Sequence, residues 1–374
     1  MGDQQAEQRR ASVPPGWAER IEGLARGDFE PPQPRLAATV VLLREHADGP
    51  QAYLLRRRAS MAFAGGMYAY PGGGVDPRDA AGVAGAVGAA DAVGAVGAAG
   101  PAEDAGWAGP SPEEWARRLG CPPATARAVV CAAVRETFEE SGVLLAGADA
   151  DSVVADVSGE EWRAARAALE AHELSFAEFL AARGLVLRSD LLGAWSRWIT
   201  PEFEERRYDT WFFVAVLPEG QRTAEIPGEA DRVAWLAPAE AVRRVAEGEY
   251  LMLPPTVTTL RELLPYASPA QALAAAAGRT VRPVLGRATA GADGSLTVDW
   301  PGYPELALAF PPTGGRSADA PPSPGPVGSE ALGTEPPGAE PKGTEPPGAQ
   351  SPDGAAPDGA VPGDGPGGLS EASR

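Results

Sequence analysis

Three glutamates lie close together in one stretch of the chain and are the residues best suited to do chemistry. Glu136, Glu139 and Glu140 stand at positions i, i+3 and i+4, which share one face of an α-helix and span an arc of about 100°. Carboxylates packed this closely repel one another, and near the C-terminal end of a helix the macrodipole adds to the penalty. A hard divalent cation, which prefers oxygen ligands and bridges phosphates, would relieve it. The alternative is an acidic helix face exposed to solvent.

A glycine-rich turn lies upstream of the glutamates. Residues 67–70 predict a short strand, which the run Pro71-Gly72-Gly73-Gly74 ends. Glycines in such a strand-to-loop turn let backbone N–H groups approach a metal site or a phosphate closely. A glycine turn followed by an acidic helix is therefore a candidate site for a metal-assisted reaction at a phosphate.

Together the two segments resemble the Nudix box, in which a Gly-led loop precedes a helix with the pattern Arg-Glu-apolar-x-Glu-Glu-x-Gly-apolar. Residues 135–143 match this pattern, except that Thr137 stands where an aliphatic residue is usual. The resemblance implies that Gly73 leads the loop and that Arg135 orients a glutamate through a salt bridge. It also implies three ligands for Mg²⁺ or Mn²⁺, namely Glu136, Glu139 and Glu140.

A long segment separates Gly73 from Arg135, whereas the usual box is compact. At the offset where the family carries an acid before the helix, this chain has Arg127. An insertion at this point is typical of one Nudix subfamily, the group that includes the mammalian peroxisomal acyl-CoA diphosphatase. That group also resembles this chain in flanking segments within roughly residues 36–265, namely 55–63, 198–201, 206–210 and 252–256.

This resemblance implies a small-molecule diphosphate as the partner, either CoA, acyl-CoA or another nucleoside-diphosphate derivative. Arg58-Ala59 matches part of the CoA-recognition signature, but the second arginine of that signature falls on Phe63. The candidate residues for binding the substrate are Gly72, Gly73 and Arg58.

The reaction that the resemblance implies is the attack of water on a phosphorus of a diphosphate. Glu136, Arg135 and Glu139 are the expected catalytic residues. The proton of the attacking water would pass to Glu136 or to a loop acid such as Glu229. Glu229 could equally be an ordinary acid on a surface loop.

Other residues near the predicted site have two readings each. Arg206 and Arg207 either bind substrate phosphate or pair with the neighbouring residues Glu204 and Glu205. The aromatic run 211–213 is better explained as core than as a platform on which a base stacks.

Two other functions compete with hydrolysis. The same fold could serve as a nucleotide-sensing module that binds without cutting, but such sensors usually lose glutamates from the helix, and this chain keeps all three. A general acidic scaffold would explain the tails of the chain but not the glycine turn with its acidic helix. We therefore favour the enzyme.

The elements that must position these residues predict the α/β class, a Nudix-type α/β/α sandwich with a mixed sheet. Apolar runs at 37–43 and 52–55 flank an Asp-Gly turn and predict a hairpin. Apolar residues at helical spacing predict a helix over 123–141, with Gly142 as its C-cap. The most apolar run, 210–217, predicts a central strand. Further strands are expected at 184–187, 195–199 and 232–236, and helices at 238–247 and 255–264.

Composition predicts one compact domain with insertions and tails. Residues 36–270 form the expected Nudix domain, interrupted by a low-complexity Ala/Gly/Val insertion at 77–111 and a helical insertion at 146–185. A flexible segment, 1–35, precedes the domain, although residues 17–24 favour a short helix. After it comes an extension, 271–312, with a hairpin around 279–300. A Pro/Gly-rich acidic tail, 313–374, cannot bury enough apolar surface to order and is expected to be disordered.

The formal net charge of −19 argues against nucleic acid or an anionic membrane surface as a partner. The start of the chain lacks a basic segment followed by an apolar one, so no secretory signal is expected and the cytoplasm is the expected compartment. Two cysteines indicate reduced thiols, and two isolated histidines, His46 and His172, exclude a multi-histidine zinc site. A homodimer and a monomer both stay open.

Overall fold

The computed structural model describes most of the expected domain and its immediate extensions. The residues that it describes are 16–59, 64–80, 106–224, 230–291, 293 and 295–310. Several predictions therefore lie outside the described residues, namely those for the centre of the Ala/Gly/Val insertion (81–105), for Phe63, for Glu229 and for the acidic tail.

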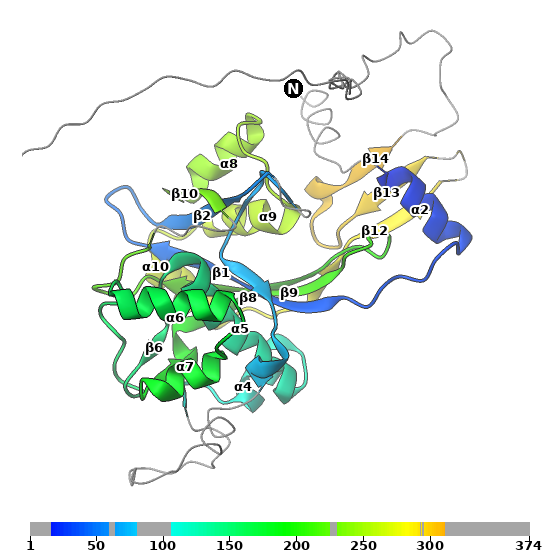
Figure 1. Ribbon diagram of the computed structural model, residues 1–374. Helices are drawn as coiled ribbons and strands as arrows, with labels where there is room; N and C mark the ends of the chain where they lie inside the picture. Colours follow the sequence, from blue (N-terminus) through cyan, green and yellow to red (C-terminus); the bar gives the residue numbers. More distant parts are fainter. Residues whose placement is uncertain are drawn as a thin grey trace, which may run out of the picture. The chain divides into compact units, whose positions relative to one another are not determined.

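A mixed sheet forms the centre of the domain, and its strands run in the order β10-β2-β1-β9-β8-β11 (Figure 1). β1 pairs in parallel with β9 and antiparallel with β2. Two short strands extend this sheet outside that order. β3 pairs with β2, and β4 pairs with β1. The strand bounds are β1 Arg35–Arg44, β2 Gln51–Arg57, β3 Tyr68–Ala69, β4 Gly72–Gly74, β8 Leu192–Ile199, β9 Tyr208–Val216, β10 Ala230–Leu236 and β11 Pro283–Leu285.

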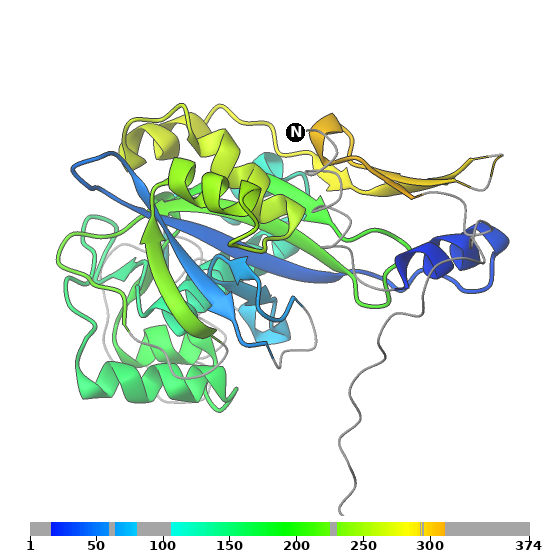
Figure 2. The same cartoon turned by 90° about the horizontal axis from the view of Figure 1, so that it is seen from above.

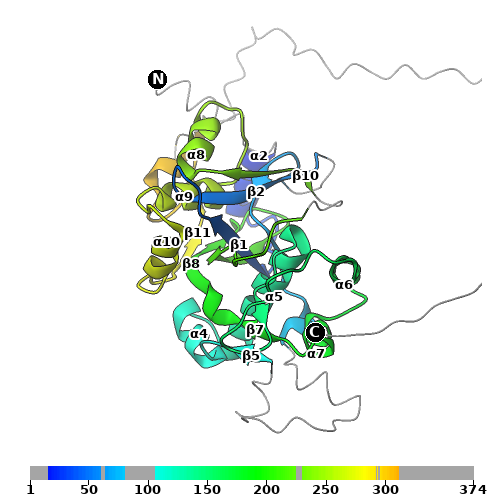
Figure 3. The same cartoon turned by 90° about the vertical axis from the view of Figure 1, so that its left-hand side faces the viewer.

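Helices cover both faces of this sheet, as Figure 3 shows edge-on. α4 (Pro112–Leu119) and α5 (Pro123–Ser141) lie on one face. The other face is covered by α8 (Pro238–Ala246), α9 (Pro254–Leu263) and α10 (Pro269–Ala276). The predicted α/β/α sandwich with a mixed sheet is confirmed.

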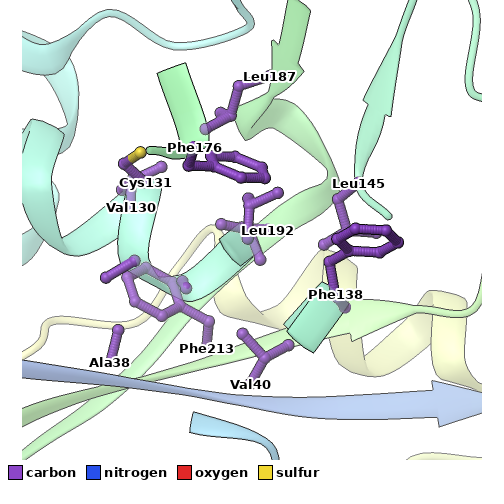
Figure 4. Close-up of a cluster of buried hydrophobic side chains, with 14 of the residues drawn as sticks. Ala38, Val40, Val130, Cys131, Phe138, Leu145, Phe176, Leu187, Leu192 and Phe213 are labelled. Atoms are coloured by element: carbon purple, nitrogen blue, oxygen red, sulfur yellow. The ribbon is translucent and has the colours of Figure 1, made fainter. Parts of the chain in front are cut away.

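Alternation along the strands explains why there are two cores. In β1, Val40 and Leu42 pack toward α5, whereas Val41 and Leu43 pack toward α9 and α10, as the period of two in a strand requires. Figure 4 shows the first core, in which Phe213 of β9 and Val40 of β1 approach side chains of α5. The aromatic run 211–213 is mostly core, as predicted, since Trp211 and Phe213 are fully buried.

The helical insertion packs against α5. It contains α6 (Glu160–Glu170) and α7 (Phe176–Ala182), close to the expected helices. A separate three-stranded sheet includes the strands at the two ends of this insertion. Its order is β5 (Trp107–Ala108), β7 (Val186–Arg188) and β6 (Ala146–Gly147). The 3₁₀ helix η3 (Ser189–Leu191) follows β7.

Composition predicts that the low-complexity insertion at 77–111 is flexible, but both of its ends form regular structure. Residues Pro77–Ala80 form a 3₁₀ helix, η1, and β5 lies near the far end of the insertion. Asp79 is the buried residue of η1. The sequence interpretation was wrong at this end because it treated 77–80 as part of the Ala/Gly/Val stretch that follows.

Both terminal segments carry structure and lie next to each other (Figures 1 and 2). The segment before the domain forms α2 (Trp17–Arg26), so it is not uniformly flexible. The extension forms the expected hairpin of β12 (Arg287–Ala290) and β13 (Leu296–Asp299), which gains a third strand, β14 (Leu308–Phe310), after η4 (Pro304–Leu306). Among the described residues, no helix has the length and apolar character needed to cross a membrane.

Candidate active site

The end of α5 carries the three glutamates, and local sequence explains why the helix ends there. Gly142 adopts the left-handed conformation, with φ at 71°, and its N–H caps the helix by donating to the Phe138 carbonyl. α5 begins at a proline, which suits the first turn of a helix because it needs no amide donor there. Glu136 and Glu139 are buried, with exposed fractions of 9% and 6%, and Glu140 is partly buried.

The glycine turn lies directly against these carboxylates. β4 pairs antiparallel with β1, so that Gly73 stands opposite Ala38. The Gly72 N–H donates to Oε2 of Glu140 at 2.8 Å. A Cβ on Gly73 would meet both carboxylate oxygens of Glu136 at 2.6 Å, which is closer than real contacts allow. The structure thus brings together the glycine turn and the glutamates that the sequence separates by a long insertion.

Arg135 is the centre of an ion-pair network behind the glutamates. Its Nη1 donates to Glu136 at 2.9 Å and to Glu139 at 3.2 Å. Its Nη2 donates to the Gly74 carbonyl at 2.8 Å, which ties the helix to the glycine strand. These contacts place Arg135 between two of the glutamates and the glycine strand.

Asp79 completes the network and is the residue that the sequence interpretation missed. Its carboxylate accepts from Nε and Nη2 of Arg135 at 3.1 and 3.0 Å, and only 3% of the residue is exposed. Arg127, which stands at the offset expected for an acid, instead lies over the ring of Trp107. The signal was available, because Asp79 follows Gly73 closely and the long insertion begins after it.

Burial controls the acidity of the site. It raises the pKa of Glu136 and of Glu139, although Arg135 opposes the shift in both, and it raises the pKa of Asp79 for the same reason. For Arg135, burial alone would lower the pKa, but the surrounding carboxylates raise it, so the guanidinium stays charged. Neighbouring carboxylates add to the raised pKa of Glu139, including Glu170 of α6.

The donor set suits a hard divalent cation. Three carboxylates (Asp79, Glu136 and Glu139) pair with one guanidinium in a largely buried place, and Glu140 follows on the same helix, which leaves excess negative charge there. A divalent cation offsets such charge and takes oxygen ligands. Within the described residues, no three acidic, histidine or cysteine side chains are already arranged as a ligand set. Arg135 holds Oε1 of Glu136 and both oxygens of Glu139, and each of these oxygens keeps a further lone pair that can face a cation.

These side chains open onto a large cleft with a volume of about 1880 Å³. Gly72, Gly73 and the three glutamates line it. Two residues of the helical insertion also line the cleft and were not predicted, Glu170 and His172. His172 is less isolated than the sequence suggested, because its Nδ1 lies 3.4 Å from Asp76.

The arginines proposed to bind substrate differ in their positions. Arg206 lines the cleft, as one of its two readings requires. Arg207 fits neither reading, because it is buried and donates to the carbonyls of Thr200 and Pro32. Arg58 is exposed and does not line the cleft, whereas its neighbour Arg57 does.

The fold and the site together define a member of the Nudix hydrolases. A crystal structure of a NUDIX hydrolase from Alicyclobacillus acidocaldarius has the same fold, with a TM-score of 0.51 and 25% identity, over 65% of this chain and 96% of that one. Residues 35–263, more than half of the chain, match the family model described as the NUDT19 Nudix domain. The chain belongs to this family, and the expected subfamily is confirmed.

Curated relatives agree with the family assignment. Acyl-coenzyme A diphosphatase NUDT19 of Gallus gallus is 28% identical over 158 residues, which are 37% of this chain and 41% of that protein. The Xenopus laevis protein of the same name is 27% identical over 150 residues, 37% of this chain and 39% of that protein. The chain thus matches about two fifths of the length of these relatives.

Proposed function

We propose that this protein hydrolyses a diphosphate linkage in a nucleoside-diphosphate derivative, with CoA or acyl-CoA as the substrate class, and that it depends on Mg²⁺ or Mn²⁺. The observation that carries the proposal is the contact of the glycine strand with Glu136 and Glu140, two of the three glutamates of α5. The names of the curated relatives support the substrate class.

The proposed roles follow from the contacts. Glu136, Glu139 and Glu140 would hold the cation, which when bound would neutralise phosphate oxygens and acidify the attacking water. Arg135 holds Glu136 and Glu139 in place from behind, and Asp79 fixes Arg135. The lack of a side chain on Gly73 makes room for the Glu136 carboxylate beside the glycine strand. The proton from water would pass to Glu136 or to another carboxylate of the cleft wall.

Glu140→Gln tests the metal assignment. Because the amide keeps an oxygen for the Gly72 N–H but loses the charge that a cation needs, we expect turnover to fall by about 100-fold or more, with the melting temperature little changed. The wild-type protein and the variant are incubated with Mg²⁺ and a panel of CoA, acyl-CoA, ADP-ribose and NADH. Wild-type activity in the variant would show that the metal ligands lie elsewhere.

The same panel separates the enzyme from a sensor. If the wild-type protein binds members of the panel but cleaves none of them with either Mg²⁺ or Mn²⁺, the protein is a binding module and the proposed function is wrong. Calorimetry with the same ligands provides the binding measurement.

A further inference from the structure

The cleft extends beyond the family domain, because both terminal segments contribute to its lining. The family model covers residues 35–263, whereas Trp17, Trp300, Leu306 and Leu308 line the same cleft as the glutamates and lie outside that range. We call these four residues the terminal wall. They come from α2, from the residue that follows β13, and from η4 and β14.

The N-terminal part of the terminal wall is held firmly. The ring of Trp17 meets Phe203 edge-on at 4.8 Å, and its Nε1 donates to Glu204 at 2.6 Å. Arg20, one turn along α2, donates to the same carboxylate at 2.6 Å. Two donors from one helix thus converge on Glu204, in the loop between β8 and β9, and fix the orientation of the Trp17 ring.

The C-terminal part is held in a similar way. Tyr303 packs against Trp198 with ring centroids 5.0 Å apart, and its hydroxyl donates to Glu262 at 2.9 Å. Trp300 is buried, whereas Leu306 and Leu308, which follow Tyr303, are only partly covered although both line the cleft. The fold therefore anchors the extension through aromatic and polar contacts and leaves leucine surface open toward the cleft.

The volume of the cleft and the chemistry of its lining indicate which kind of substrate the terminal wall binds. Pockets for small molecules usually measure about 300–1,000 Å³, so a cleft of about 1880 Å³ has room for much more than a diphosphate. One part of the cleft carries carboxylates and the glycine strand, and the four residues of the terminal wall are apolar, although Arg20 and Glu305 of the same segments also line the cleft. A substrate that fills both must carry a hydrocarbon group at a distance from its diphosphate.

We propose that the terminal wall binds a hydrocarbon group of the substrate and thereby makes the enzyme prefer diphosphates that carry one. The inference rests on the proposed function and deepens it. Removing water from the hydrocarbon and from the leucines stabilises the complex in proportion to the apolar area buried. The wall comes from segments other than the glycine strand and α5, which carry the residues assigned to the reaction, so it contributes to binding and specificity and leaves the chemical step unchanged.

The test compares two substrates that share one diphosphate, CoA and dodecanoyl-CoA. In the double variant Leu306→Ala/Leu308→Ala, we expect KM for dodecanoyl-CoA to rise about tenfold, with kcat unchanged and KM for CoA within about twofold. Leu264→Ala is the matched control, because Leu264 is 49% exposed and does not line the cleft. Melting temperatures establish that each variant is folded.

Two outcomes overturn the inference. If the folded double variant keeps the wild-type ratio of KM values for the two substrates, the terminal wall does not recognise the hydrocarbon, and the proposed function stands. If wild-type protein cleaves neither substrate, calorimetry decides, since equal affinity for CoA and dodecanoyl-CoA also contradicts a hydrocarbon site. Should the double variant unfold, Leu306→Trp replaces it, and we expect this larger side chain to raise KM for dodecanoyl-CoA selectively.

Discussion

Gly73 and Gly74 are neighbours in β4, but only Gly73 faces a carboxylate. A methyl group on Gly73 would overlap the Glu136 carboxylate, whereas a methyl group on Gly74 would have nothing within 4 Å. Glu136 cannot move away freely, because Arg135 holds it and it is buried. We expect Gly73→Ala to lower kcat by about 100-fold, since a displacement of about 1 Å at a catalytic group can cost that much. Steady-state kinetics with the best substrate of the panel measures it.

Gly74→Ala is the matched control for this substitution. It adds the same methyl group one residue further along the strand, so activity within about twofold of wild type is expected. Equal losses in both variants would show that β4 is sensitive to any side chain and that the contact with Glu136 is not special.

At the level of residues, helical spacing alone was enough to predict that Glu136, Glu139 and Glu140 share one face. Asp79 closely follows Gly73 in the sequence, but helical spacing does not reach it, because its contact with Arg135 spans a long insertion and depends on tertiary packing. Glu170 reaches the cleft only because α6 packs against α5. The positions of Asp79 and Glu170 depend on how the insertions fold against α5. The spacing of apolar residues in the sequence does not determine that packing.

The helical insertion supports α5 through a cluster of aromatic rings. Phe179 of α7 is fully buried, and its ring lies 5.3 Å from Phe138, 5.6 Å from Phe176 and 6.1 Å from Trp162. Phe138 belongs to α5, one residue before Glu139. The insertion is therefore part of the structure that holds α5, the helix with the three glutamates.

Phe179→Ala should lower the free energy of unfolding by about 3–5 kcal/mol, because it removes a large buried ring and leaves a cavity among three others. Urea denaturation followed by circular dichroism measures the change. Val233→Ala is the control, since Val233 is 40% exposed and such surface substitutions change stability by about 0.5 kcal/mol or less. A loss below about 1 kcal/mol for Phe179→Ala would mean that α7 is not part of the cooperative unit.

Among the elements, those with strong local patterns were predicted well. The helix over 123–141 coincides with α5, because apolar spacing, an initial proline and a terminal glycine all point to the same bounds. The hairpin of β1 and β2 follows from its Asp-Gly turn. By contrast, the parallel pairing of β1 with β9 joins segments far apart in the chain, and no local signal specifies that partner.

For the whole molecule, charge is the property with the clearest consequence. The tail from residue 313 carries nine acids and three bases, roughly a third of the net charge of −19. Its composition offers little apolar surface to bury. A substrate with a diphosphate is itself anionic, so the negative charge of the tail would oppose its approach through repulsion, which salt screens over about 10 Å at 0.1 M ionic strength.

Ending the chain after residue 312 should therefore leave the catalytic parameters nearly unchanged. The shortened protein keeps the terminal wall and every described residue of the cleft, so kcat and the melting temperature should match those of the full chain. At low ionic strength kcat/KM should rise slightly, by less than about twofold, because less negative charge opposes the anionic substrate. That difference should vanish at about 0.5 M salt. A large loss of kcat would contradict this view, since a tail that acts only through its charge cannot alter the chemical step.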